Sequence, residues 1–218
     1  FEYLKHAGDY GISVSDYSAD FPKVIKRSRD VADGMSKGIQ FLLKKNKIDV
    51  INGYGKLKAG KKVEVTAADG TVTTYDANHI ILATGARSRE LPGLKQDGKK
   101  VIGYRDAMVL PELPKSMVIV GSGAIGCEFA YFYNSMGTKV TIVEFMPNIV
   151  PIEDEDISKQ LGRSFKKIGI DIMTEATVES VDTSGSGCQV KVKTKKGEEM
   201  IACDVVLSAV GITPNIEN

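Results

Sequence analysis

Residues 118–129, "VIVGSGAIGCEF", place three glycines within six residues, between an apolar run and a run of helical character. Gly121, Gly123 and Gly126 have the spacing G-x-G-x-x-G. The spacing alone is a weak signal, since glycines cluster in many turns, but its context strengthens it. The apolar run predicts a buried strand, and residues 124–136 predict a helix. A strand, a glycine loop and a helix in this order are typical of a dinucleotide-binding unit.

Each of the three glycines has its own physical reason in such a unit. Gly121 permits the tight turn, Gly123 lets the backbone approach a pyrophosphate without a Cβ atom in the way, and Gly126 lets helix and strand pack closely. The N-terminus of the helix then offers unpaired N–H groups and a partial positive charge to the phosphates. The loop therefore predicts a pyrophosphate site.

An acidic residue follows at the distance that this kind of unit requires. Glu144 closes the predicted strand "KVTIVE", 23 residues after Gly121, where a carboxylate can accept hydrogen bonds from ribose hydroxyls. Two unit charges 4 Å apart interact by about 4 kcal/mol at an effective dielectric of 20, so Glu144 would repel the extra phosphate of NADP. Residues 144–156 contain no Lys or Arg to offset this charge. We expect NAD rather than NADP; the alternative is a tight strand–helix turn with a chance surface glutamate.

The chain also contains an internal repeat. Residues 63–85 and 190–211 each read as an alternating strand, a turn glycine, a second strand and an apolar strand that ends in glycine. The turn glycines are Gly70 and Gly197, and the final glycines are Gly85 and Gly211. The repeat predicts two copies of one nucleotide-binding design, although two unrelated hairpins remain an alternative.

The two copies differ in what precedes them. The second follows a strand–loop–helix–strand unit at 117–144, whereas the first follows only residues 1–20 and a helix at 20–46. That helix carries apolar residues on one face and lysines and arginines on the other, which we interpret as a solvated face. If both copies begin alike, the first glycine loop lies before Phe1. We therefore expect the chain to be a middle piece of a longer protein.

Composition excludes several classes of function. The chain has 218 residues, 42% of them hydrophobic, which suits one or two globular domains. Its net charge of +1 creates no overall electrostatic attraction to nucleic acid or to a membrane surface. Cys127, Cys188 and Cys203 have neither zinc-site nor C-x-x-C spacing, so we expect three small buried or half-buried thiols and a reducing, cytoplasmic compartment. His6 and His79 stand alone, and no metal site is expected.

Five stretches resemble one enzyme family in the same order along the chain. They are "VINGYGKL" (50–57), "IILATGA" (80–86), "VGSGAIGCEFAYFYNSMGTKVTIVEF" (120–145), "EDEDISKQLGRSFKKIGI" (153–170) and "VGITPN" (210–215). They resemble the FAD- and NAD-dependent pyridine nucleotide–disulfide oxidoreductases, and the likeness covers essentially all 218 residues. The acid-rich helix start with "RSFKK" favours the branch that oxidises dihydrolipoamide. Another flavin disulfide reductase, an NADH oxidase and a free-standing NAD-binding module remain alternatives.

The resemblance implies an α/β fold of two related domains. A Rossmann-like NAD-binding domain, with a central parallel sheet and a β-meander, would be inserted in a partial FAD-binding domain of the same design. Residues 1–87 would belong to the FAD-binding domain, 88–210 to the NAD-binding domain, and 211–218 to the return to the FAD-binding domain.

The resemblance also implies cofactor-binding residues. Ile125 and Glu128 match positions beside the nicotinamide, although Ile125 and Val178 could equally be core residues. The residues that match FAD-binding positions are Gly55, Thr84, Gly85 and Ala86. Those that match NAD-binding positions are Gly121, Ser122, Gly123, Ala124, Ile125, Gly126, Glu128, Glu144, Val178 and Gly211.

Several parts of the family pattern are absent from this sequence. It has no C-x-x-x-x-C, no glycine loop for the ADP part of FAD, no late aspartate motif and no C-terminal dimerisation domain with its His–Glu pair. In the family, electrons pass from dihydrolipoamide on a lipoyl carrier protein through a disulfide and FAD to NAD, in a homodimer. We therefore assign no catalytic residue and expect this chain alone to be inactive and to retain NAD binding but not FAD.

Overall fold

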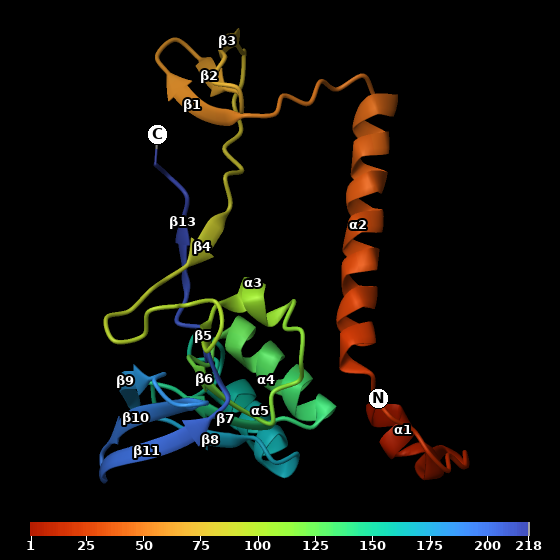
Figure 1. Cartoon of the computed structure of the whole chain (residues 1–218), viewed down its shortest axis with the longest axis vertical. Coiled ribbons are helices and arrows are strands. Elements are labelled where there is room, and N and C mark those ends of the chain that lie inside the picture. Colours follow the sequence, from red (N-terminus) through yellow and green to blue (C-terminus); the bar gives the residue numbers. More distant parts are fainter. Residues whose placement is uncertain (218) are drawn as a thin grey trace. The chain divides into compact units, whose positions relative to one another are not determined.

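The computed structural model describes residues 1–217, which form two compact units (Figure 1). The large unit comprises Phe1–Arg27 and Ser88–Thr213, and the small unit comprises Ser28–Arg87 and the residues from Pro214 onward. The chain passes between the units within helix α2 and near strands β4 and β13. Among the described residues, no helix is long and apolar enough to span a membrane.

A five-stranded parallel sheet forms the centre of the large unit. Its strand order is β5-β12-β6-β7-β8, and every neighbouring pair is parallel. The predicted α/β class with a central parallel sheet is therefore confirmed. The strands are β5 (Val101–Ile102), β6 (Ser116–Val120), β7 (Lys139–Val143), β8 (Asp171–Met173) and β12 (Val205–Ser208).

Helices cover one face of this sheet. Successive side chains of a strand point to opposite faces, so Met117 and Ile119 of β6 belong to a core that also contains Tyr133 from α4 and Phe165 from α5. The predicted helix that ends at Gly137 is confirmed, because Gly137 takes the left-handed conformation that ends α4. The helices of this unit are α1 (Glu2–Lys5), the 3-10 helix η1 (Ala7–Tyr10), α3 (Tyr104–Ala107), α4 (Ala124–Met136) and α5 (Glu155–Lys167).

An antiparallel meander covers the other face. Val118 and Val120 of β6 belong to a second core with Val190 and Val192 of β10, both fully buried. The large unit thus has three layers: helices, parallel sheet and meander. The predicted β-meander is confirmed; its strands are β9 (Thr177–Asp182), β10 (Cys188–Thr194) and β11 (Gly197–Cys203).

Helix α5 has acidic residues in its first turn and basic residues in its last, as the helix dipole favours. Asp154 caps it by accepting a hydrogen bond from the backbone N of Asp156, at 2.8 Å. Phe165 is buried, whereas Ile157, two turns earlier, is 59% exposed. Ser158 is the buried residue in this turn of the helix, and its hydroxyl donates a hydrogen bond to the carbonyl of Val150.

The small unit contains a second meander of the same kind. Strands β1, β2 and β3 pair antiparallel, and the predicted turn at Asp69-Gly70 joins the last two. Gly70 has φ +85°, and Asp69 accepts a hydrogen bond from the backbone N of Thr71 at 2.9 Å. The strands are β1 (Tyr54–Lys58), β2 (Lys62–Thr66) and β3 (Val72–Asp76), followed by β4 (Ala86–Ser88), which pairs with β13 (Ile212–Pro214).

The predicted strand at 79–85 is wrong. These residues have no regular secondary structure, and Ile81 and Leu82 are 90% and 64% exposed. The corresponding segment of the second repeat, β12, is a strand because β5 and β6 pair with it on either side. A strand needs a neighbouring strand for its backbone hydrogen bonds, and among residues 1–217 no strand pairs with 79–85.

Helix α2 (Phe21–Lys45) starts where the sequence predicts. Asp20 accepts a hydrogen bond from the backbone N of Lys23, at 3.1 Å, and Phe21 is buried against Phe132 and Tyr133. The apolar face further along the helix is exposed within the described chain; its residues are Val31, Met35, Ile39 and Leu42.

Replacing Gly126 by Ala should destabilise the large unit. A Cβ atom there would lie 2.1 Å from the carbonyl oxygen of Gly121, so helix and loop must separate, at a cost of about 1–3 kcal/mol. Gly162→Ala in α5 is the matched control, because its Cβ would meet nothing closer than 3.9 Å; it should stabilise by up to about 1 kcal/mol. Urea unfolding followed by circular dichroism measures both, and equal midpoints would contradict this packing.

Candidate functional site

The glycine loop connects β6 to α4. At two of its three glycines, the surrounding backbone leaves no room for a Cβ atom. Gly121 has φ +97°, and a Cβ atom on it would lie 2.5 Å from the carbonyl oxygen of Ala209, which follows β12. Gly126 is required by its contact with Gly121. Gly123 differs, because a Cβ atom there would meet nothing within 4 Å. The folded chain therefore leaves open space at the position where the sequence places a pyrophosphate.

Ser122 and Glu144 join the loop to the end of β7. One carboxylate oxygen of Glu144 accepts from both the backbone N and the hydroxyl of Ser122, at 2.8 and 2.6 Å. The other oxygen accepts from the backbone N of Met146 at 2.7 Å. Ser122 is fully buried and Glu144 is 7% exposed. The carboxylate thus holds the loop in place, a role that the sequence spacing did not reveal.

The carbonyl of Ser122 extends this network to a neighbouring loop. It accepts a hydrogen bond from the backbone N of Val150 at 2.9 Å and one from the thiol of Cys127 at 3.2 Å. Val150 has φ +41°, which is uncommon for a β-branched residue, so this loop is held against its own backbone preference. Burial, with a further contribution from the charge of Glu144, raises the pKa of Cys127 to about 11, so its thiol stays protonated at neutral pH.

The N-terminus of α4 differs from those of the other two long helices. Asp20 and Asp154 cap α2 and α5, but the N-cap of α4 is Gly123, which has no side chain to do so. The first backbone N–H groups of a helix have no partner within the helix. At α4 they form an uncapped donor set next to the open space at Gly123, which suits an anion.

The remaining predicted NAD-side residues lie on three elements around this loop. Ala124 and Glu128 are exposed on α4, and Ile125 is half-buried there. Val178 on β9 is partly buried and packs against the core between sheet and meander. Gly211 follows β12 with φ +107°, and its carbonyl accepts from the backbone N of Arg89.

The predicted FAD-side residues gather around an open cavity of about 1050 Å³ in the small unit. Gly55 of β1 and the segment Thr84-Gly85 line this cavity, and Ala86 follows as the first residue of β4. The lining also includes residues 214–217. The structure therefore brings three of the four residues to one cavity, and it adds a wall from the C-terminal segment.

Asn215 organises that wall and was not among the predicted site residues. The hydroxyl of Thr84 donates to the carbonyl of Asn215 at 2.6 Å, and the side-chain amide of Asn215 donates back to the carbonyl of Thr84 at 3.0 Å. The backbone N of Asn215 donates to the carbonyl of Gly85, and Arg87 donates to its side-chain oxygen. The stretch "VGITPN" was visible in the sequence, but spacing alone could not pair it with residues 84–87.

Sequence comparison finds relatives across the whole chain. The family model described as pyridine nucleotide-disulphide oxidoreductase matches residues 7–218. A dihydrolipoyl dehydrogenase from Chlorobaculum parvum is 42% identical over 218 residues, covering 100% of this chain and 46% of that protein. One from Rhizobium etli is 40% identical over 233 residues, covering 100% of this chain and 48% of that protein. The chain thus spans about half the length of the curated relatives it matches.

Solved structures agree with these relatives. LpdA from Mycobacterium tuberculosis superposes with a TM-score of 0.87 at 30% sequence identity, over 98% of this chain and 46% of that one. The HOCl-induced flavoprotein disulfide reductase RclA from Escherichia coli gives a TM-score of 0.76 at 27% identity, over 99% of this chain and 47% of that one. With the glycine loop, the parallel sheet and the meander, these matches show that the chain belongs to the pyridine nucleotide-disulphide oxidoreductase family.

Proposed function

We propose that this chain carries the NAD site of a dihydrolipoyl dehydrogenase, together with part of its FAD site. The observation that carries the proposal is the glycine loop, with Gly123 facing open space and Ser122 anchored by Glu144. In the whole protein, electrons would pass from dihydrolipoamide on a lipoyl carrier protein through a disulfide and FAD to NAD, which accepts them as a hydride. We assign homodimer formation and catalysis to regions of the whole protein other than these 218 residues.

The pyrophosphate of NAD would lie at the N-terminus of α4. The uncapped N–H groups there donate hydrogen bonds, and the helix dipole adds a partial positive charge. The missing Cβ atom at Gly123 lets the backbone approach the phosphates closely. Gly121, Ala124, Ile125 and Gly126 complete the loop.

The adenosine ribose would lie beside Glu144. A carboxylate offers about four acceptor positions, and the Ser122 and Met146 donors occupy three of them. The remaining position, on the oxygen that faces Met146, can accept from a ribose hydroxyl. The same negative charge would repel the 2′-phosphate of NADP.

The other assignments follow the family resemblance. Ile125 and Glu128 would lie beside the nicotinamide, with Val178 and Gly211 bordering the same site. In the small unit, Gly55, Thr84, Gly85 and Ala86 would contact FAD, and Asn215 would hold the Thr84-Gly85 backbone in position for it. This division assigns 88–210 to the NAD-binding domain, and 1–87 with 211–218 to the FAD-binding domain.

A second candidate is another flavin disulfide reductase, and the superposition on RclA favours it. Both candidates require the same nucleotide sites in this part of the chain. They differ in the substrate that delivers electrons, which the whole protein would select.

Replacing Gly123 by Val should weaken NADH and NADPH binding together. The folded chain accepts the side chain, because a Cβ atom meets nothing within 4 Å, but the side chain would occupy the place of the pyrophosphate. The poorer N-cap should cost no more than about 1 kcal/mol of stability. Fluorescence titration measures the affinities and urea unfolding checks the fold; unchanged NADH affinity in a folded variant would contradict the pyrophosphate site.

Replacing Glu144 by Gln should change the preference between the two dinucleotides. We expect NADPH to gain about tenfold relative to NADH, or ~1.4 kcal/mol, because solvent and salt screen the repulsion below its upper limit of about 4 kcal/mol. Ser122→Ala is the control, because it removes one bond to Glu144 and keeps the charge. It should weaken both dinucleotides equally. Calorimetric titration gives the ratio for each protein, and an unchanged ratio in Glu144→Gln would mean that the acid is not at the ribose.

The purified chain should carry well under one flavin per chain. Gly55, Thr84 and Gly85 line an open cavity, and the FAD phosphate loop of the family is absent from this sequence. Without bound flavin, dihydrolipoamide and NAD should yield no NADH. Visible absorbance after desalting and a coupled NADH assay test both points; one equivalent of flavin that survives desalting would refute the expectation.

A further inference from the structure

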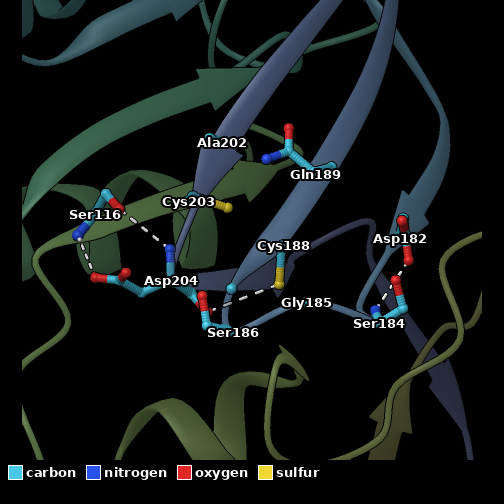
Figure 2. A pocket seen from close by; sticks show the side chains of 11 residues that line it. Ser116, Asp182, Ser184, Gly185, Ser186, Cys188, Gln189, Ala202, Cys203 and Asp204 are labelled. Carbon is cyan, nitrogen blue, oxygen red and sulfur yellow. Dashed lines mark hydrogen bonds between the residues drawn. The ribbon is translucent and has the colours of Figure 1, made fainter.

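A cavity of about 480 Å³ lies at the edge of the large unit away from the glycine loop. Ser116, the first residue of β6, lines it, whereas the glycine loop follows the last residue of β6. The rest of the lining comes from the end of β9, the loop 184–187, the start of β10, the end of β11 and Asp204 (Figure 2). The nucleotide sites proposed above do not use this cavity.

Two cysteines at the open end of the β10–β11 hairpin, 15 residues apart in sequence, face each other here. Cys188 and Cys203 are directly opposed in the antiparallel pairing of β10 with β11, and Figure 2 shows both thiols among the lining residues. Opposed residues of such a pair have Cα atoms about 4.5–5.5 Å apart, within the range of about 4.4–6.8 Å that a disulfide spans. The thiols are also close enough for each to perturb the pKa of the other.

We propose that Cys188 and Cys203 are an oxidisable thiol pair, which forms an intrachain disulfide by exchange with a small disulfide compound that enters this cavity. The pair would be a modification site separate from electron transfer to NAD. Its oxidation would tie the first residue of β10 to the last residue of β11.

The exchange balances in two steps. The thiol of Cys188 loses its proton to solvent, and its sulfur attacks one sulfur of the small disulfide, which breaks that bond and releases one small thiol. The sulfur of Cys203, after losing its own proton, attacks Cys188, forms the intrachain bond and releases the second small thiol. The protein pair is oxidised by two electrons, and the small disulfide is reduced to two thiols.

The surroundings favour Cys188 as the first sulfur to react. Burial raises the pKa of both thiols, to about 12 for Cys203, but the nearby charge of Lys100 partly offsets this effect at Cys188. The rim of the cavity beside Cys188 is Ser184-Gly185-Ser186-Gly187, whose small side chains leave room for a small reagent. Because both thiols are buried and mostly protonated, the exchange should be slow.

Cys127 provides an internal control. It belongs to the core between the parallel sheet and the helices, whereas Cys188 and Cys203 belong to the core on the opposite face. The thiol of Cys127 donates to the carbonyl of Ser122. The sheet therefore separates Cys127 from the pair.

The test is exposure of the native 218-residue chain to bis(2-hydroxyethyl) disulfide, followed by alkylation, mass spectrometry and tryptic mapping. Trypsin places each cysteine on its own peptide: 116–139, 168–191 and 197–218. We expect the loss of two hydrogen atoms, a link between the last two peptides, and alkylation of Cys127 alone. An unchanged mass, a final product with reagent still attached, or a link to Cys127 would overturn the proposal.

Variants separate the two steps. Cys203→Ala should stop at the mixed disulfide and gain one hydroxyethylthio group on peptide 168–191. Cys127→Ala should form the same link as the unmodified chain. If Cys203→Ala gains no group while the unmodified chain forms the link, the order of attack is wrong; if Cys127→Ala forms no link, the pair does not act independently.

Discussion

The hydrogen bonds between Ser122 and Glu144 are the constraint on which the nucleotide-binding part of the structure depends. A carboxylate is costly to bury unless donors satisfy it, and Glu144 has three, two of them on one serine. Because Ser122 also accepts from Val150, the bonds connect the end of β6, the end of β7 and the loop after it in one hydrogen-bonded network. The glycine loop is therefore shaped before any ligand arrives.

This arrangement gives one acidic residue two tasks. Glu144 holds the glycine loop through its hydrogen bonds to Ser122. In the proposed function, its remaining acceptor position also accepts a hydrogen bond from a ribose hydroxyl of NAD. Preorganisation of this kind lowers the entropy cost of binding, because the loop does not have to become ordered when the ligand binds. It also explains why Glu144 is buried rather than standing free at the surface.

Much of the fold was predictable because its determinants are local. The loop glycines, the apolar strand before them and the end of α4 at Gly137 all follow from short stretches of sequence. The predictions fail where the structure of a segment depends on a partner that is distant in sequence. The apolar stretch 79–85 has the composition of β12 but no neighbouring strand, and Asn215 meets Thr84 and Gly85 through a long-range contact that spacing does not encode. For the site, the loop was visible in the sequence, but the anchoring role of Glu144 was not.

The stretch 79–85, which has no strand partner in the described chain, would also have a consequence in concentrated solution. Ile81 and Leu82 are exposed beside backbone groups that no strand of the described chain pairs. Such a segment can template a strand from another molecule, as an uncovered sheet edge does. Contacts between molecules in concentrated solution would then involve 79–85, a segment that contributes no residue to either hydrophobic core of the described chain.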